Sequence, residues 1–485
     1  MSRAAIGLVL AKLLLLTAGA MVLPILCALA YPGEGDLLPL IESVALIGGT
    51  GGVLFAAFRR APELGPGGAV VSAVAGWLLV SAASTLPFLL HGAIPTFTDA
   101  FFEMMSGYTT TGATILPDVE AVPHGLLFWR SETHLLGGMG FLTLIVLVQP
   151  RALDGLRLFR AESSPGQVIT RERLLPRTRD VMVRLWALYL GLVGLHVVLL
   201  RVGGMSLFDA LCHSFGTLST SGYSTKNASL GHYGSAFIEW TTIVFMVLGG
   251  VSFVLLLQVL MGRGREVLQN TELRWYGAIL AVLCAGTSLS LWARGGLGVG
   301  DAAREGTFQV VSLLTTTGFT TVDYEGWPQA SQMLLVVASM VGACAGSTTS
   351  GIKVVHFVVL WQYTTATVKK MFFQPLAVIS VRLNGERVAP EAIHLAVAYF
   401  AVNVALILVG GCLMTALDDL DIGSAMSAVV AALMNIGPGF GEVGPSHTFA
   451  PLSGSAKWLL SWLMLVGRLE MFTALVVFYP SFWRR

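Results

Sequence analysis

The sequence predicts an all-α polytopic membrane protein, and three observations support this fold class. Only 12% of the 485 residues are charged and 55% are hydrophobic, whereas a soluble protein has about 25% charged residues. Apolar stretches of ~20 residues, long enough to cross a bilayer as helices, recur along the whole chain. A polar hairpin motif also occurs four times between such stretches. Composition and pattern together exclude a soluble protein.

The apolar stretches predict ten crossings. They lie at about 4–30, 37–58, 68–91, 125–149, 181–201, 235–261, 275–296, 329–367, 390–417 and 456–480. Most Lys and Arg residues fall on one side of these spans, notably in the loops at 151–180 and 368–388. Because positively charged loops stay in the cytoplasm, we expect both termini to be cytoplasmic.

One pattern repeats four times along the chain: a span, a short amphipathic stretch, a polar hairpin with a central glycine, and a second span. The hairpins are Thr109–Thr114, Ser219–Ser224, Thr315–Thr320 and Met434–Gly439. The pattern predicts four membrane–pore–membrane repeats. We place them at 63–160, 161–266, 267–385 and 386–485, the third containing an intramembrane loop.

The amphipathic stretch before each hairpin is too short to cross a bilayer, and we expect it to form a half-helix. Thirteen residues before the hairpin glycine stand Asp99, Asp209, Glu305 and Ser424. An oxygen acceptor suits a helix N-terminus, where free N–H groups and the positive end of the dipole lie. Each half-helix is therefore expected to start at the outer face and to point its negative end into the membrane, which favours a cation there.

The hairpins themselves predict an ion pore. Irregular backbone at membrane depth is tolerated only where protein buries it or water lines it. Four hairpins around one axis would supply a ring of carbonyl oxygens that replaces the hydration shell of a cation, and glycine permits the dihedral angles that such a turn needs. A single Thr/Gly hairpin is typical of an ordinary loop, but four equivalent copies indicate a pore. Carbonyl chemistry alone leaves the choice between K⁺ and Na⁺ open.

The span 329–367 is too long for a simple crossing, and small and hydroxyl residues interrupt it at Gly342–Gly351. This composition disfavours a continuous helix. We interpret the segment as a flexible loop that blocks permeation until it moves; a Gly/Ser-rich helix-packing segment is the alternative. Arg468 lies within the last span, where a charge is costly unless it is hydrated or paired. We expect Arg468 to line water and repel cations, whereas Lys353 either does the same or extends toward the cytoplasm.

These motifs, over nearly the whole chain, resemble those of the TrkH/TrkG branch of the Trk/Ktr/HKT superfamily of potassium transporters. Besides the hairpins, the resemblance rests on Gly137–Gly140, Leu248–Phe253, Gly342–Lys353, Asn435–Gly441 and Tyr479–Arg484. It implies two extra N-terminal transmembrane helices at 1–62, a homodimer with one pore per subunit, and a place in the bacterial inner membrane. The chain departs from the family pattern at Thr349-Ser350, where relatives often have Gly-Gly, at His134, where an aromatic residue is common, and at Ser221, where Gly or Ala is frequent.

The resemblance also implies roles for individual residues. The selectivity filter would comprise Thr110, Thr111, Gly112, Thr220, Ser221, Gly222, Thr316, Thr317, Gly318, Asn435, Ile436 and Gly437. Of these, K⁺ would bind at Thr111, Gly112, Ser221, Gly222, Thr317, Gly318, Ile436 and Gly437. The gate would comprise Gly342, Ala345, Gly346, Ser347, Thr348, Thr349, Gly351, Lys353 and Arg468. In relatives, Ser in place of the first filter glycine favours sodium; because all four glycines are present here, we expect K⁺.

Three functions fit a chain of this kind to different degrees. We favour K⁺ uptake through a gated, channel-like filter, regulated by a separate cytosolic ring of the TrkA type that binds the nucleotide. No cofactor is then expected in this chain beyond the permeating K⁺, and a net charge of +1 gives no sign of a nucleic acid partner. The alternative is K⁺ symport with H⁺ or Na⁺, which usually needs a buried carboxylate, with Glu470 as the main candidate. We expect no enzymatic activity, because no span contains paired catalytic carboxylates.

Overall fold

The computed structural model describes residues 2–140, 178–372, 380–469 and 471–484. Within these residues the regular secondary structure is mostly helical, which confirms the predicted all-α fold class. The one sheet among them is a two-stranded antiparallel hairpin of β1 (Arg382–Leu383) and β2 (Glu386–Arg387). Asn384 and Gly385 between the strands both have positive φ, as a type I′ turn requires.

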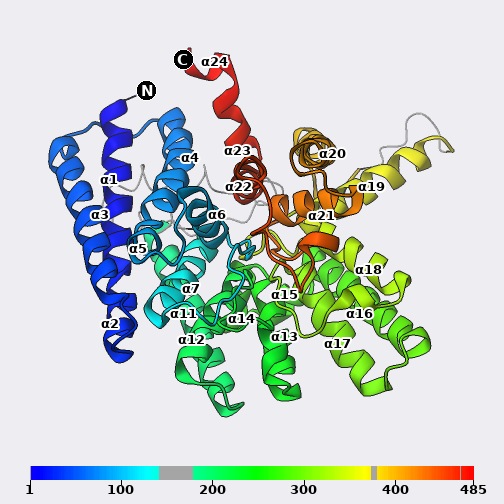
Figure 1. Cartoon of the computed structure of the whole chain (residues 1–485). Helices are drawn as coiled ribbons and strands as arrows, with labels where there is room; N and C mark the ends of the chain where they lie inside the picture. Colours follow the sequence, from blue (N-terminus) through cyan, green and yellow to red (C-terminus); the bar gives the residue numbers. More distant parts are fainter. Residues whose placement is uncertain (1, 141–177, 373–379, 470, 485) are drawn as a thin grey trace.

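Three N-terminal helices stand at one flank of the molecule (Figure 1). They are α1 (Arg3–Ala20), α2 (Val22–Ala30) and α3 (Leu37–Phe58). Helix α1 packs against α3 and against α4 (Pro66–Ala83), and α2 packs against α7 (His124–Gly138). These helices therefore cover the outside of the first repeat.

The rest of the chain forms four groups of helices in the same order: a long helix, a short pore helix, and a helix that is broken or ends near a glycine. Group 1 is α4, α5 (Leu86–His91), the pore helix α6 (Phe97–Tyr108) and α7. Group 2 is α11 (Thr178–Val202), the pore helix α12 (Leu207–Ser219), α13 (Ala236–Gly249) and α14 (Phe253–Leu260), followed by α15 (Gly264–Leu268).

The third and fourth groups follow the same order. Group 3 is α16 (Thr271–Arg294), the pore helix α17 (Val299–Leu314), α18 (Gln329–Met340) and α19 (Val354–Lys370). Group 4 is α20 (Pro390–Asp418), the pore helix α21 (Ile422–Leu433), α22 (Gly454–Arg468) and α23 (Phe472–Leu475). Short helical turns complete the chain: η1 (Ser229–Tyr233), η2 (Tyr324–Gly326), η3 (Gly441–Val443), η4 (Val476–Phe478) and α24 (Pro480–Trp483).

The broken helices correct part of the predicted span pattern. Six helices of the described residues are long and apolar enough to cross a membrane, or eight if two bent pairs each count as one span. The predicted spans 235–261 and 456–480 are each broken: α13 and α14 meet at 101°, and α22 ends at Arg468. The predicted span 125–149 is described only as far as residue 140. Residues 341–353 divide the span 329–367, as its composition predicts.

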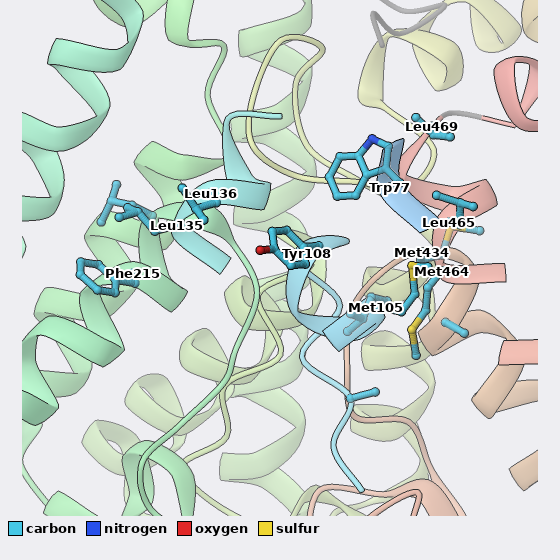
Figure 2. Packing of buried hydrophobic residues seen from close by; sticks show 14 of the residues in the cluster. Trp77, Met105, Tyr108, Leu135, Leu136, Phe215, Met434, Met464, Leu465 and Leu469 are labelled. Atoms are coloured by element: carbon cyan, nitrogen blue, oxygen red, sulfur yellow. The ribbon is translucent and has the colours of Figure 1, made fainter. Parts of the chain in front are cut away.

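The four groups close into a ring. The helix that follows each pore helix packs against the pore helix of the next group: α7 against α12, α13 against α17, α18 against α21, and α22 back against α6. Figure 1 shows the sequence colours passing round the centre from cyan through green to orange and red. Figure 2 shows the closing junction, where Met105 of α6 gathers with Met434 and with Met464 of α22.

The N-termini of two pore helices carry hydroxyl side-chain caps. Thr96 and Ser206 accept hydrogen bonds from the N–H groups of Asp99 and Asp209 at 3.2 and 3.0 Å, and their hydroxyls donate to the same carboxylates at 2.7 Å. Each cap satisfies an otherwise free N–H group. The predicted acids therefore lie in the first turn, and the capping residue precedes each by three positions.

The remaining pore helices differ from each other. In α21 the cap is Asp421, which accepts from the N–H of Ser424 at 3.1 Å; hydrogen bonds from Ser424 lower the pKa of the Asp421 carboxyl. The prediction that Glu305 starts a half-helix is wrong: α17 begins at Val299 after Gly298, and its first-turn acid is Asp301. The spacing from the hairpin glycine fails here because α17 has 16 residues, whereas α6 has 12.

Glycine permits the closest of these contacts. A Cβ on Gly137, near the end of α7, would overlap the carbonyl oxygen of Tyr108 at the end of α6. We predict that Gly137→Ala lowers the free energy of unfolding by about 1–3 kcal/mol, the usual cost of overpacking, and so lowers the midpoint of thermal unfolding in detergent. Gly191→Ala is the matched control, because no heavy atom lies within 4 Å of its Cβ position in α11. Equal midpoints for the two variants would contradict this packing.

Candidate ion-binding site

All four pore helices end in the same pair of backbone hydrogen bonds. The N–H of Thr111 donates to the carbonyl of Ser106 at 2.9 Å, and that of Thr110 donates to the carbonyl of Gly107 at 3.1 Å. This is the Schellman motif. The equivalent pairs are Ser221–Gly216 (2.9 Å), Thr220–Thr217 (3.2 Å), Thr317–Ser312 (2.8 Å), Thr316–Leu313 (3.1 Å), Ile436–Ala431 (2.9 Å) and Asn435–Ala432 (3.2 Å). The four hairpins therefore share one backbone conformation at this point, although the fourth has a different sequence.

The turning residue of each motif is left-handed without being glycine. Its φ is 54° at Thr110 and Thr220, 53° at Thr316 and 55° at Asn435. Asparagine visits this region readily, whereas a β-branched threonine is an outlier there. Such conformations cost of order 1–3 kcal/mol each and persist only where the surroundings impose them. Three strained threonines at equivalent positions mark the hairpins as a functional site.

The glycine two residues later joins the hairpins into a closed ring. A Cβ on Gly112 would lie under 3.0 Å from the carbonyl oxygen of Ser221. The same holds for Gly222 against Thr317, Gly318 against Ile436, and Gly437 against Thr111. Each hairpin thus touches the next, and the fourth returns to the first. We call the carbonyl oxygens of Thr111, Ser221, Thr317 and Ile436 the carbonyl ring.

Side chains of the ring residues are engaged elsewhere. The hydroxyls of Thr111, Ser221 and Thr317 hydrogen-bond the hydroxyls of Thr109, Ser219 and Thr315, two residues earlier, at 2.8, 2.5 and 2.8 Å. In the fourth hairpin, the amide of Asn435 donates to the Thr111 hydroxyl and to the Met464 carbonyl, both at 2.9 Å. Because these hydroxyls already form hydrogen bonds within the protein, the main-chain carbonyls are the oxygens left to contact an ion.

A buried ion pair supports the first hairpin from behind. Arg130 Nε lies 2.6 Å from Glu103 Oε1, and both side chains are almost fully buried. The Glu103 carboxylate also accepts from Thr114 Oγ1 at 3.0 Å and from the Ile115 N–H at 2.9 Å, just after Gly112. Arg130 donates to the carbonyl of Ser224 at 3.1 Å, in the second hairpin. The pair therefore connects α6 and α7 to both hairpins.

One mouth of the ring is a small polar hollow. It has a volume of about 190 Å³ and is lined by residues of all four groups, among them Thr114, Ser224, Thr320 and Pro438. Gly439–Gly444 borders this region and matches the pattern Gly-x-Gly-x-x-Gly. It lies in the fourth hairpin and η3, rather than between a strand and a helix, so it lacks the context of a dinucleotide-binding turn.

Residues 341–353, which we call the intramembrane loop, lie against the hairpins where the pore helices end. Thr348 Oγ1 donates to the carbonyl of Leu218 at 2.9 Å and lies 3.4 Å from Thr220 Oγ1. The N–H of Ser350 donates to Thr316 Oγ1 at 3.2 Å. The loop therefore contacts the strained threonines of two hairpins, on the side of the ring opposite the polar hollow.

Backbone hydrogen bonds also attach the loop to the break between α13 and α14. Cys344 N–H donates to the carbonyl of Gly250 at 3.0 Å, and Phe253 N–H donates to that of Gly346 at 3.0 Å. The carboxylate of Glu272, at the start of α16, accepts from the N–H groups of Ala345 and Val355 at 2.8 and 3.2 Å.

The other predicted gate residues lie in the same loop. Gly342 N–H donates to the carbonyl of Ile352 at 2.9 Å, Ser347 Oγ donates to that of Cys344 at 2.6 Å, and Lys353 Nζ donates to the carbonyl of Thr349. Lys353 is buried rather than extended toward the cytoplasm. Gly351, with φ 76°, packs near Met434.

Arg468 connects three groups of helices at this level. From the end of α22 it donates to the carbonyls of Gly137 and Gly138 at 2.5 and 2.8 Å, and to that of Thr348 at 2.9 Å. A fourth hydrogen bond reaches Ser350 Oγ at 3.2 Å. The guanidinium therefore joins the ends of α22 and α7 to the intramembrane loop. The sequence predicted that Arg468 lies within the last span, but it did not predict these hydrogen-bond partners.

Several buried residues of the site were not predicted. Glu103, Arg130 and Glu272 act through partners between 11 and 94 positions away in the sequence, where no local pattern gives a signal. Glu132 of α7 is also buried, and its Oε2 has no hydrogen-bond partner among the described residues. The predicted carboxylate Glu470 lies outside the described residues. Within the part of the chain that the structure covers, no three His, Cys, Asp or Glu side chains converge to hold a metal ion.

A membrane-embedded ring of pore helices around main-chain carbonyls defines a cation transport protein rather than an enzyme, and comparison with known proteins agrees. Residues 51–275 and 293–485 match the TrkH family model, described as a cation transport protein. The chain belongs to the TrkH family.

Relatives match over almost their full length. The chain is 36% identical to the Trk system potassium uptake protein TrkH of Salmonella typhimurium, with 99% of both proteins covered. It is 30% identical to the Trk system potassium uptake protein TrkG of Escherichia coli, covering 96% of this chain and 95% of that protein. The crystal structure of the potassium transporter TrkH from Vibrio parahaemolyticus superposes with a TM-score of 0.88 at 32% identity, with both chains fully covered.

The ion pair behind the first hairpin gives a stability prediction. Glu103→Gln leaves the buried Arg130 without its counter-charge, and we expect a loss of about 3–5 kcal/mol in the free energy of unfolding. The double variant Glu103→Leu/Arg130→Met removes both charges and should be less destabilised than the single variant. Thermal unfolding of the purified protein measures both. A single variant as stable as the wild type would contradict the supporting role of the pair.

Proposed function

We propose that this protein takes up K⁺ through a gated, channel-like selectivity filter. The observation that carries the proposal is the carbonyl ring, in which a main-chain oxygen of each hairpin lies against the glycine of a neighbouring hairpin, so that the four hairpins close on themselves. Each hairpin follows the C-terminal end of a pore helix, where the helix dipole is negative. Oxygens so placed would replace water around a cation as it enters, and the twelve filter residues of this proposal belong to the four hairpins.

Potassium is the ion we assign. The relatives are named potassium uptake proteins, and the four glycines of the filter are all present. An inside-negative membrane potential, worth ≈ 2.3 kcal/mol per charge per 100 mV, would drive K⁺ inward without coupling to another ion.

The intramembrane loop and Arg468 would form the gate. The loop lies across the inner ends of two hairpins, and Arg468 places a positive charge beside it. A cation leaving the filter would meet both a steric and an electrostatic barrier. Opening would require the hydrogen bonds from Arg468 to Thr348, and those from the loop to Gly250, to break.

Symport with H⁺ or Na⁺ is the second candidate, and Glu132 favours it. A buried carboxylate with an oxygen that lacks a hydrogen-bond partner is the kind of group that takes up a proton. Reversal potentials measured under imposed K⁺, Na⁺ and pH gradients separate the two modes, because a passive pore follows the K⁺ gradient alone.

We also propose the setting in which this pore works. The protein would sit in the bacterial inner membrane as a homodimer with both termini in the cytoplasm, and a cytosolic ring of the TrkA type would bind the nucleotide and control the gate. The basic loop 151–180 that we associate with this docking lies largely outside the described residues.

Uptake of isotopic K⁺ by proteoliposomes tests the function, and Gly112→Ser tests the filter. A serine side chain at Gly112 would collide with the Ser221 carbonyl and distort the carbonyl ring. We expect a lower ratio of K⁺ to Na⁺ uptake. Gly277→Ser in α16, where no heavy atom lies within 4 Å of the Cβ position, is the control. An unchanged ratio in Gly112→Ser would contradict this filter, and no K⁺ uptake by the wild type would contradict the function.

Removing Arg468 tests the gate. We predict that Arg468→Ala raises K⁺ flux through the purified protein, because both a positive charge and four hydrogen bonds are lost. Arg468→Lys keeps the charge without the bidentate geometry, so its flux separates the electrostatic from the tethering contribution. Arg294→Ala, at an exposed position, is the matched control. Wild-type flux in Arg468→Ala would rule out a barrier at this residue.

A further inference from the structure

One junction of the fourfold ring is open. Of the four junctions at which a helix packs against the pore helix of the next group, the one between α18 and α21 is the least closely packed. A groove of about 590 Å³ lies there. Its walls are apolar and include Met333, Val336 and Met340 of α18, and Met426 and Val430 of α21. Met333 is 62% exposed, so the groove opens sideways, toward the bilayer.

The polar side chains along the groove are satisfied within the protein. Ser427 Oγ accepts from the Phe440 N–H at 2.6 Å, Ser424 Oγ accepts from the Glu442 N–H at 3.0 Å, and Ser339 Oγ donates to the Val336 carbonyl at 2.8 Å. A buried water needs two to four polar partners. The walls therefore suit hydrocarbon better than water.

The two helices that form the groove have about the length of one lipid leaflet. Helices α18 and α21 have 12 residues each, which is about 18 Å at 1.5 Å per residue. Half of the ~30 Å hydrocarbon core is about 15 Å. Both helices start on the same side as the polar hollow, where the carboxylate of Asp421 and the side chain of Gln329 are exposed at the rim.

We propose that the groove binds one acyl chain of an outer-leaflet phospholipid with an ammonium-bearing headgroup, which lies beside Asp421. Methionines at three positions of the wall allow it to adapt to the chain. The inner end of the groove is lined by Ile436 and Pro438, on either side of Gly437. The bound acyl chain therefore packs behind the fourth hairpin. At the other three junctions of the ring, protein side chains fill the equivalent space.

Photolabelling tests this site without depending on ion flux. The full-length protein is reconstituted in vesicles of phosphatidylethanolamine and phosphatidylglycerol that contain phosphatidylethanolamine with a diazirine at the end of one acyl chain. We expect labelling to concentrate on peptides of α18 and α21. Val430→Phe fills the groove and should reduce this labelling about tenfold, the equivalent of about 1.4 kcal/mol. Val336→Phe, from the opposite wall, is the second variant, and thermal unfolding establishes that both fold.

Controls distinguish a site from bulk lipid. Val282→Phe, on a face of α16 where Val282 is 69% exposed, should leave the labelling of α18 and α21 unchanged. Labelling that is equal in the wild type and both groove variants would overturn the proposal in favour of unspecific lipid contact. Disulfide-linked dimers of Met333→Cys would overturn it in favour of a second copy of the chain. Asp421→Asn should remove a preference for phosphatidylethanolamine over phosphatidylglycerol probes, and no such preference in the wild type would overturn the headgroup assignment.

Discussion

The contact on which this structure depends is that between each hairpin glycine and the carbonyl of the next hairpin. Four such contacts, from Gly112 round to Gly437 and back to Thr111, leave no space for a Cβ at any of the four positions. They fix the distance between neighbouring pore helices, because each hairpin is tied to its own helix by a Schellman motif. The positive φ of Thr110, Thr220 and Thr316 belongs to these Schellman motifs.

Closure of the ring also explains why the surrounding helices break. Gly137, Gly249 and Gly467 let α7, α13 and α22 approach the ends of their pore helices closely, and beyond these points the helices end or turn. The carbonyls freed at such ends need donors at membrane depth. Arg468 supplies them to Gly137 and Gly138. The same guanidinium also donates to the intramembrane loop, so one side chain serves both the broken helices and the proposed gate.

The fourfold repeat made the ring of hairpins predictable, but the differences between the repeats could not be predicted from it. Four hairpins around a central glycine predicted the ring before any contact was known, because equivalent sequences fold in equivalent ways. The position of Glu305 was wrong because helix length varies between repeats, and the breaks after Gly249 and near Arg468 were missed because an apolar run looks alike whether straight or bent. The partners of Glu103 and Glu272 lie far away in the sequence, so only the fold reveals them.

The central claim is that a dehydrated cation sits within the carbonyl ring. Crystals of the protein grown with Tl⁺ in place of K⁺, measured at the thallium absorption edge, test it most directly. The account predicts an anomalous peak on the axis, equidistant from the carbonyl oxygens of Thr111, Ser221, Thr317 and Ile436. Protein that transports Tl⁺ yet shows its peaks only elsewhere, with none between these four oxygens, would contradict the account.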